Sequence, residues 1–307
     1  MDPLSDVLAL LKPRSYMSGG FDMGGAWSLQ FPQHLGTKCY ALVSGQCWLS
    51  VDGVAEAARI EAGDCFLLPT GRPFVLTSDR ALVPIDAHAV FGFPLNGRIR
   101  TVGGGGDCFG VGGHFILSGP HVDMLMGALP PIVHLRSPSD KAALRWAIER
   151  MMDELREPRP GSLLMAQHLA HMMLVQALRL HLSQGPSGGV GWLFALADRH
   201  MGQAIGAMHE APGRRWTLQE LARHVGMSRT VFAERFKRTV GTSPMDYLTG
   251  WRMMLAGDRL RHSDEPVSVI AQALGYESEA AFGTAFKRVM GCSPRQYGRT
   301  GAGSVAF

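Results

Sequence analysis

Long apolar runs and a basic leader are both missing from this 307-residue sequence, and each absence excludes a class of protein. No apolar run reaches the roughly 20 residues that a helix needs to cross a bilayer, which excludes a membrane span. The opening stretch MDPLSDVLALLKPRS has two aspartates before a short apolar segment and no basic residue ahead of it, unlike a secretory signal. We therefore expect a cytoplasmic protein with no membrane partner.

Paired cysteines are also missing, since the five cysteines stand singly and none forms a C-x-x-C pair. A zinc ribbon or a thioredoxin-type site is therefore not expected, and buried free thiols are the simplest interpretation. A redox sensor among Cys39, Cys47, Cys65 and Cys108 stays open, because sensing needs an exposed thiolate of low pKa. If residues 44–45 form a two-residue hairpin turn, Cys39 and Cys47 point to opposite sides and cannot form a disulfide.

Catalytic signatures are missing as well. The sequence contains no G-x-S-x-G turn, no Walker loop and no H-E-x-x-H pair. It therefore predicts no catalytic residue, no cofactor and no enzyme activity.

Charge is nearly balanced overall, at +4, but it is unevenly placed. Residues 1–195 contain 15 Lys and Arg against 16 Asp and Glu, whereas residues 196–307 contain 15 against 10. The basic excess lies in the last third of the chain, which favours a polyanionic partner for that part.

Short apolar runs closed by turn residues occupy the segment from about residue 20 to 125, among them CYALVSG, CWLSVDG, CFLLPTG and PFVLTS. Such runs are typical of the strands of a barrel or sandwich. From about 138 to 183 the apolar residues follow helical spacing, with Ser139 or Asp140 as the expected N-cap. Pro158 and Pro160 separate two helices there, and SQGPSGGVG (183–191) reads as a flexible linker.

The second of these helices is apolar around much of its circumference, so it needs a partner on more than one side. That partner is the barrel, a second subunit or both, and we expect a homodimer. His168 and His171 are spaced i, i+3 on this helix, but without a carboxylate beside them we read them as packing residues and expect no metal.

Two stretches near the end of the chain repeat each other. GMSRTVFAERFKRTVGTSPMDY begins at Gly226, and GYESEAAFGTAFKRVMGCSPRQY begins at Gly275. Each copy reads as a helix, a glycine-containing turn and a second helix, which Ser228 or Ser278 is suited to cap. In a helix-turn-helix unit the second helix enters the DNA major groove. The alternative is an all-helical bundle with an internal duplication.

The repeated signature resembles that of the AraC/XylS family of bacterial transcription regulators, from about Leu196 to Tyr297. The resemblance implies two helix-turn-helix units joined by a long helix, here about Pro244 to Arg261. Such a helix would hold the two recognition helices about one DNA turn apart, roughly 34 Å, so that one monomer reads two successive major-groove segments of promoter DNA. The resemblance also favours an activator, with RNA polymerase as a further partner.

By the family pattern, the exposed front of each second helix contacts DNA. The first set is Ser228, Arg229, Thr230, Ala233, Glu234, Lys237 and Arg238, and the second is Ser278, Glu279, Ala280, Gly283, Thr284, Lys287 and Arg288. The serines cap the helices and offer backbone N–H groups to an anion, the Lys-Arg pairs contact phosphates, and the others face bases. The second set has few long donors, so we expect weak or indirect base readout from it.

The barrel segment resembles the cupin fold found at the front of many such regulators. The second cupin motif, G-x5-P-x-G-x2-H-x3-N, keeps Gly63, Pro69 and Gly71 in place. Phe74 stands where the motif has its histidine, and Ser78 where it has its asparagine.

The first cupin motif is also depleted, because Lys38 stands at its glutamate position and only His34 remains as a ligand. A catalytic metal site needs about three converging ligands, so we expect no metal. His34, Lys38, Trp48 and Phe74 are instead candidates for the lining of a partly apolar effector pocket. A filled barrel without a ligand is the alternative.

Together these observations predict an α+β multidomain chain. We expect a cupin-like sensor barrel over residues 1–135, a helical linker and dimerisation region over 136–190, an all-α DNA-binding domain with two helix-turn-helix units over 191–300, and a tail over 301–307. The predicted function is that of a transcription activator that senses a small molecule or an oxidant. The alternatives are a cupin-type metal-dependent enzyme fused to a DNA-binding domain, and an architectural DNA-binding protein whose barrel only dimerises.

Overall fold

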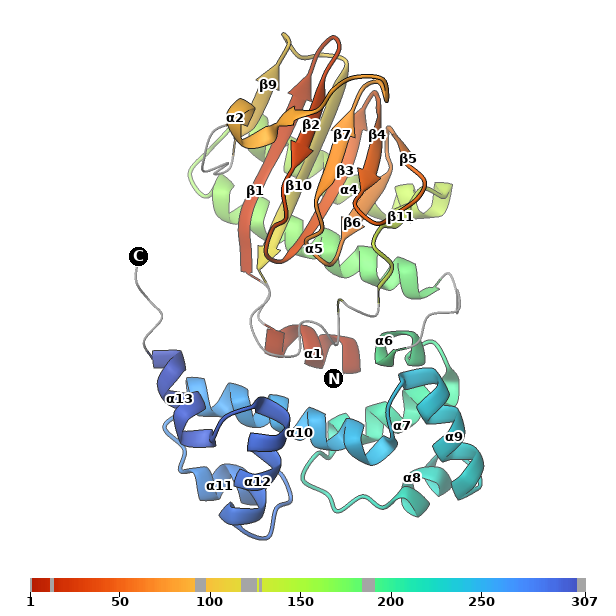
Figure 1. The fold of residues 1–307 in the computed structure, drawn as a ribbon, viewed down its shortest axis with the longest axis vertical. Helices are drawn as coiled ribbons and strands as arrows, with labels where there is room; N and C mark the ends of the chain where they lie inside the picture. Colours follow the sequence, from red (N-terminus) through yellow and green to blue (C-terminus); the bar gives the residue numbers. More distant parts are fainter. Residues whose placement is uncertain are drawn as a thin grey trace. The chain divides into compact units, whose positions relative to one another are not determined.

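The computed structural model describes residues 2–11, 14–91, 98–116, 126, 129–183 and 191–302. These residues form two compact units, one rich in strands and one helical (Figure 1). Among the described helices, none combines the length and the apolar character that a membrane span requires. The predicted linker at 183–191 falls almost wholly outside the described residues, as does most of the tail.

Two sheets form the strand-rich unit. The six-stranded sheet has the order β11 (Val133–Leu135), β6 (Cys65–Leu68), β3 (Thr37–Ser44), β10 (Cys108–Ile116), β1 (Arg14–Met23), β9 (Ile99–Val102). The five-stranded sheet has the order β5 (Ala58–Glu61), β4 (Gln46–Val51), β7 (Phe74–Thr77), β2 (Ser28–Phe31), β8 (Ile85–Asp86). The β1–β9 and β2–β8 pairs are parallel, whereas the other pairs are antiparallel.

A single apolar core fills the space between the two sheets. Strand alternation supplies it, as β4 shows: Cys47, Leu49 and Val51 are buried, while Trp48 and Ser50 between them are only partly covered. The four apolar runs read from the sequence correspond to β3, β4, β6 and β7.

The hairpin considered for residues 44–45 does not form. Although β4 follows β3 after a single residue, β3 pairs with β10 and β6, whereas β4 pairs with β5 and β7 in the other sheet. The turn is a corner between sheets, where Gly45 has a φ of +77° and a Cβ atom would collide with the backbone oxygen of Asp107.

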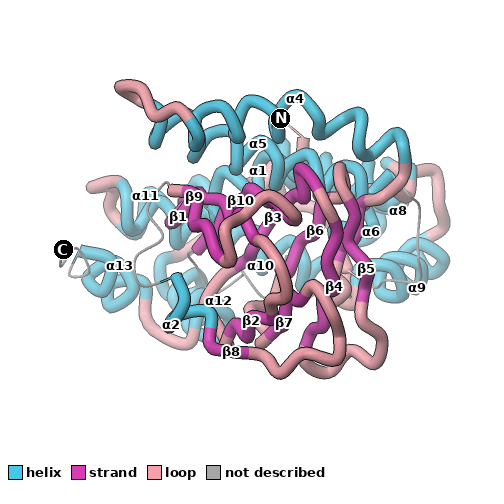
Figure 2. The backbone as a smooth tube through the Cα atoms, turned by 90° about the horizontal axis from the view of Figure 1, so that it is seen from above, coloured by secondary structure: helices cyan, strands magenta, loops and turns pink. Residues whose placement is uncertain are grey.

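Two long helices, α4 (Pro138–Arg156) and α5 (Ser162–Ser183), cover the outer face of the six-stranded sheet (Figure 2). The expected N-cap at Ser139 or Asp140 is wrong by two to three residues. Ser137 caps α4 and accepts a hydrogen bond from the Asp140 N–H, because Pro138 at the first helical position already has a helical φ. The helices α4 and α5 pack on the barrel and belong to the same compact unit as its strands. The domain boundary expected at residue 135 remains a prediction from the sequence.

The helical unit consists of short helices around one long helix. Its elements are α1 (Pro3–Leu11), α6 (Trp192–Ala195), α7 (Arg199–Glu210), α8 (Leu218–His224), α9 (Arg229–Val240), α10 (Pro244–His262), α11 (Val267–Ala273), α12 (Glu279–Met290) and α13 (Pro294–Ala302). The long helix predicted from about Pro244 to Arg261 is therefore present as α10. In Figure 1, α7 to α9 lie at one end of α10 and α11 to α13 at the other.

The first helix of the chain, α1, belongs to the helical unit and not to the barrel that follows it in sequence. Its buried Leu4, Val7 and Leu8 lie on the side that packs against α7 and α10. The Asp6 carboxylate lies 3.4 Å from Nδ1 of His209 on α7. No pattern in the sequence had placed this segment there.

Candidate nucleic-acid interface and barrel cavity

The two helix-turn-helix units have the same turn geometry. Gly226 and Gly275 close the first helices with φ values of +68° and +81°, a region that glycine adopts without steric cost. Their N–H groups donate to the carbonyls of Arg223 (3.1 Å) and Gln272 (3.0 Å). The second turn is one residue longer, because two residues separate Gly275 from Ser278 whereas one separates Gly226 from Ser228.

The second helix of each unit begins at the predicted serine. Ser228 Oγ accepts from the Val231 N–H at 3.4 Å, and Ser278 Oγ accepts from the Ala281 N–H at 3.2 Å. The other backbone N–H groups of each first helical turn remain available to an anion such as a DNA phosphate.

The predicted DNA-contacting residues form one face on each second helix. On α9, Ser228, Arg229, Thr230, Glu234, Lys237 and Arg238 are exposed, and on α12, Ser278, Glu279, Ala280, Thr284, Lys287 and Arg288 are exposed. Ala233 and Gly283 are half-buried at equivalent positions. Phe232, Phe236, Phe282 and Phe286 lie fully buried on the opposite face, as expected of core residues.

The two faces differ in the chemistry they offer. On α9, Arg229, Thr230 and Glu234 provide a donor, a methyl-bearing hydroxyl and an acceptor for base edges. On α12 the Thr284 hydroxyl already donates to the Ala280 carbonyl at 3.0 Å, and Glu279 lies 3.6 Å from Arg295. These contacts and the glycine at 283 leave α12 with less capacity for direct readout.

A loop between α7 and α8 contacts both helix-turn-helix units, and no pattern in the sequence predicted it. Arg252 on α10 donates through Nε to the Pro212 carbonyl at 2.7 Å and through Nη2 to the Arg214 carbonyl at 2.8 Å. Arg215 in the same loop forms a 2.9 Å ion pair with Glu277 in the second turn. This loop and α10 together connect the two helix-turn-helix units.

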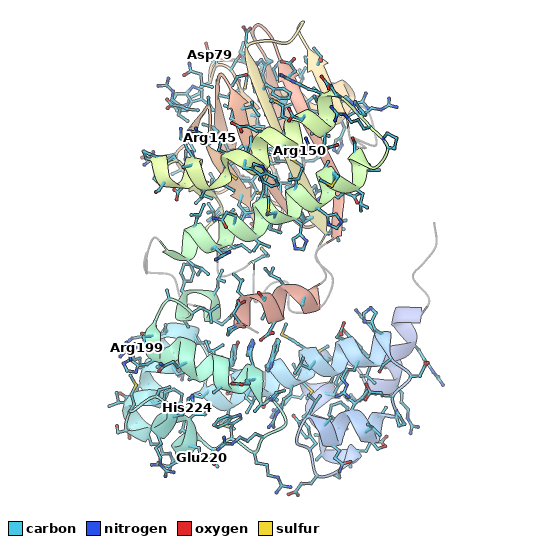
Figure 3. All side chains as sticks on the ribbon, turned by 180° about the vertical axis from the view of Figure 1, so that it is seen from behind. Asp79, Arg145, Arg150, Arg199, Glu220 and His224 are labelled. Carbon is cyan, nitrogen blue, oxygen red and sulfur yellow. The ribbon has the colours of Figure 1, made fainter. Side chains whose placement is uncertain are left out.

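The first helix-turn-helix unit is also held to the start of α7. Arg235 on α9 donates to the Asp198 carboxylate at 2.6 Å, and Asp198 caps α7. Glu220 and Thr217 form a capping box at the start of α8 (Figure 3, where Glu220 and His224 are labelled). The second unit lacks such a box, because Pro266 precedes α11.

The barrel contains a small cavity of about 40 Å³ that is partly open to solvent. Strands β1, β2, β3, β7 and β9 line it together with α2 (Ala87–Phe91). Its walls are mostly aromatic, from Phe21, Phe31, Tyr40, Phe74 and Phe91.

Two of the four predicted pocket residues line this cavity. Lys38 and Phe74 face it, on β3 and β7. His34 does not line it and instead packs against the ring of Phe74, at 5.8 Å between ring centroids. Trp48 lies on the outward-facing side of β4, where its ring is 5.4 Å from the Arg80 guanidinium.

The four barrel cysteines lie in two buried pairs. The Sγ atoms of Cys39 and Cys65, on neighbouring strands, are 3.8 Å apart. Cys47 lies next to Cys108 between the sheets. The contact with its partner thiol and burial raise the pKa of Cys47 and of Cys65, so neither is a ready thiolate. Sequence reasoning had separated Cys39 from Cys47 but could not find either pair.

Within the described residues, no three His, Cys, Asp or Glu side chains converge in the way that a metal ion requires. Among the described residues, neither ring nitrogen of His34 has a partner that meets hydrogen-bond geometry. Burial and the nearby Lys38 lower its pKa to about 3, so the ring is neutral.

Comparison with known proteins identifies both halves of the chain. A family model described as a cupin matches residues 2–183, and one described as a helix-turn-helix domain matches residues 221–300. A protein of Streptomyces lividans described as an AraC-like transcription regulator is 42% identical over 298 residues, covering 97% of this chain and 98% of the relative. This chain is an AraC-type transcription regulator.

Other AraC-type proteins are similar over different lengths. The RCS-specific HTH-type transcriptional activator RclR of Escherichia coli is 29% identical over 307 residues, covering 97% of each chain. The solved structure of the AdpA DNA-binding domain in complex with a target DNA is 29% identical, with a TM-score of 0.31, over 32% of this chain and 87% of that one. The AraC-type assignment makes this protein a DNA-binding regulator with a cupin domain at the front and a helix-turn-helix domain behind it.

Proposed function

We propose that this regulator activates transcription by inserting α9 and α12 into successive major-groove segments of a promoter. The observation that carries the proposal is the matched exposed face on the two helices, each with a serine cap at its N-terminus and a Lys-Arg pair farther along. The 19 residues of α10 span about 28 Å at about 1.5 Å per residue, a length suited to adjacent groove segments. The relative RclR is described as an activator, and an activator would also contact RNA polymerase.

We further propose that the active species is a cytoplasmic homodimer, formed through the outer face of α5. Leu164, Met165 and Met172 on α5 are each more than 40% exposed, and Trp146 on α4 is 63% exposed. Apolar side chains of this kind grouped on one surface are typical of subunit interfaces.

The effector in this proposal is a small molecule bound in the barrel cavity, in preference to an oxidant. The cavity has mostly aromatic walls and is partly open to solvent, which suits a small organic molecule. The barrel thiols are at most 2% exposed, whereas oxidant sensing requires an accessible thiolate. Metal-dependent catalysis would require ligands that the cupin positions of this chain lack, since Lys38 and Phe74 occupy two of them.

The test is a DNA-binding titration by fluorescence anisotropy, at several salt concentrations, with fragments from around the gene of this protein. Thr230→Ala combined with Glu234→Ala should reduce discrimination between the specific site and other fragments by tenfold or more, with the salt slope unchanged. Lys237→Ala should weaken binding to every fragment alike and reduce the slope of log K against log salt by about 0.9.

Arg145→Ala is the matched control. Arg145 is exposed on α4 and labelled in Figure 3, so its loss removes the same charge as the Lys237 variant at a site far from the recognition helices in sequence. This control should bind as the wild type does. Equal binding of the wild type to every fragment, with the Thr230 and Glu234 variant unaltered, would show that α9 does not read bases.

A further inference from the structure

The loop between α7 and α8, residues 211–216, is fixed to the first helix-turn-helix unit. Trp216 at its end is buried, and the ring lies edge-on to that of His224 on α8, with 6.1 Å between centroids. The indole Nε1 donates to the Ala211 carbonyl at 3.0 Å, which closes the loop on itself. The next residue, Thr217, caps α8. The loop therefore follows any movement of the first unit.

The same loop lies directly against the turn of the second unit. A Cβ atom at Gly213 would be 2.3 Å from the carbonyl oxygen of Ala273, and one at Gly275 would be 2.4 Å from the carbonyl oxygen of Gly213. Backbones this close leave no room for a side chain, which glycine alone satisfies. The ion pair between Arg215 and Glu277 adds little to this contact, because the two side chains are 75% and 72% exposed.

Arg252, near the middle of α10, holds the loop in this position. It donates through Nε to the Pro212 carbonyl at 2.7 Å and through Nη2 to the Arg214 carbonyl at 2.8 Å. Its guanidinium carbon lies 5.7 Å from the ring centroid of Tyr276 in the second turn. The Tyr276 ring packs on Phe282 of α12, with 5.5 Å between centroids. One side chain thus contacts the loop of the first unit and an aromatic pair beneath the second recognition helix.

The contact depends on the shape of the arginine side chain. The guanidinium is planar, so its N–H groups donate in fixed directions to two carbonyls at once, whereas a lysine ammonium is a single point donor. Long helices curve, so α10 by itself does not fix the orientation of the units at its two ends. A second connection, through Arg252 and the loop, removes that freedom.

We propose that Arg252 is a positioning residue that holds the two helix-turn-helix units at one spacing, so that this regulator discriminates between sites by the distance between their two major-groove segments. The inference rests on the proposed function, in which α9 and α12 enter successive segments. One added base pair moves the second segment by about 3.4 Å along the DNA and by about 35° around it. Units held by Arg252 cannot follow that shift, whereas units joined through α10 alone follow part of it.

The test uses the full-length protein and the fragment from around its gene that the wild type binds most tightly. Hydroxyl-radical footprinting locates the protected segments, and versions with one base pair added or removed between them are titrated by fluorescence anisotropy. Either change should cost the wild type about tenfold or more in affinity. Arg252→Met and Arg252→Lys should each lose less than about threefold, while binding the original site more weakly than the wild type does. Because lysine keeps the charge, a shared effect identifies the two-carbonyl contact as the cause.

A third variant and a control separate this contact from other effects of Arg252. Gly213→Ala keeps the arginine but places a Cβ against the Ala273 carbonyl, so it should relax the spacing preference in the same way. Arg145→Met, on the exposed side of α4, should keep the wild-type preference. Thermal unfolding followed by circular dichroism establishes that each variant is folded.

Trypsin measures the state of the loop without DNA. The enzyme cleaves after arginine, and the loop offers the exposed Arg214 and Arg215. A loop that Arg252 no longer holds opens more often, so Arg252→Met and Arg252→Lys should be cleaved there about fivefold faster or more. Arg145→Met should be cleaved there at the wild-type rate.

Three results would overturn the inference: a wild type that tolerates the added base pair, a spacing preference unchanged in both Arg252 variants, or loop cleavage at the wild-type rate in both. A salt slope reduced by about 0.9 in Arg252→Met but not in Arg252→Lys would also overturn it, because that pattern marks a phosphate contact. A wild type that protects a single segment, or none, counts against the proposed function instead. The trypsin rates then decide by themselves whether Arg252 holds the loop.

Discussion

Replacing Lys38 by methionine should make the barrel more stable. Burial lowers the pKa of Lys38 from an ordinary 10.5 to about 8. This difference corresponds to ~3.4 kcal/mol, at about 1.36 kcal/mol for each tenfold change in proton affinity. Methionine matches the length of the lysine stem but loses two cation–π contacts of at least about 0.5 kcal/mol each, so we expect a net gain of up to about 2.4 kcal/mol in unfolding free energy at pH 7.

The gain should depend on pH in a defined direction. At pH 7 Lys38 is protonated in both the folded and the unfolded chain, so the folded wild type bears the full cost of the buried charge. Between about pH 8 and 10.5 the unfolded chain holds a proton that the folded chain lacks, so wild-type stability rises with pH. From pH 7 to pH 9.5 the advantage of the variant should therefore shrink by about 2 kcal/mol.

Urea unfolding of the full-length chain at pH 7.0 and pH 9.5 measures both effects. Hydrogen exchange read on peptides from β3 and β10 follows the barrel unit separately from the helical unit, because a chain with two units need not unfold in one step. Arg145→Met, which removes an exposed charge, should change the unfolding free energy by no more than about 0.5 kcal/mol at either pH. A Lys38→Met variant that is less stable than wild type at both pH values would show that Lys38 is a structural residue and would refute the reasoning.

Three further outcomes are expected. Iodoacetamide should modify Cys292, the only partly exposed cysteine among the five, well before the four barrel thiols; equal rates by mass spectrometry would restore oxidant sensing as a candidate. Leu164→Glu with Met172→Glu should convert a dimer to a monomer in light scattering, and an unchanged mass would place the interface elsewhere. Burial lowers the pKa of His209 to about 3, so below pH 6.5 the unfolded chain takes up a proton that the folded chain does not. The unfolding free energy of the wild type should then fall by up to ~1.4 kcal/mol for each unit by which the pH is lowered below 6.5. His209→Phe should flatten this slope in thermal unfolding measured as a function of pH.

Local signals were sufficient to predict the helical unit from the sequence. Gly226, Gly275 and the serines that follow them fix the turns and helix starts through backbone conformation and neighbouring N–H groups, which need no distant partner. The same residue spacing in both repeats was a second, independent indication of two helix-turn-helix units. The exposed faces of α9 and α12 followed from helical periodicity once the buried phenylalanines were assigned to the core.

The barrel was predictable only as a set of short strands. The apolar runs predict strands, but they do not specify which sheet each strand joins, so the sequence could not show that β3 and β4 belong to different sheets across Gly45. The inward or outward direction of Trp48 depends on that choice. The glycine-rich strands β1 and β10 could not be predicted for a related reason. Their glycines are required by contacts between residues far apart in sequence, since a Cβ at Gly110 would collide with the ring of Phe21.

Other contacts could not be predicted because they join distant segments through backbone atoms or single side chains. Arg252 holds a loop through two carbonyls, which any sequence would supply, so no residue pattern marks the loop. Cys39 and Cys65 meet because β3 pairs with β6, and Arg100 reaches the cavity from an edge strand. Each of these features follows from topology and not from local propensity.

The position of α1 limits how far the barrel or the DNA-binding half of this protein can be exchanged for that of a relative. A fragment that began at residue 191 would keep both helix-turn-helix units but would uncover the faces of α7 and α10 against which Leu4, Val7 and Leu8 pack. A hybrid regulator that kept this barrel and borrowed the DNA-reading half of a relative would likewise carry a foreign first helix against that surface. Modular exchange should therefore succeed only when the first eleven residues and the last third of the chain come from the same parent.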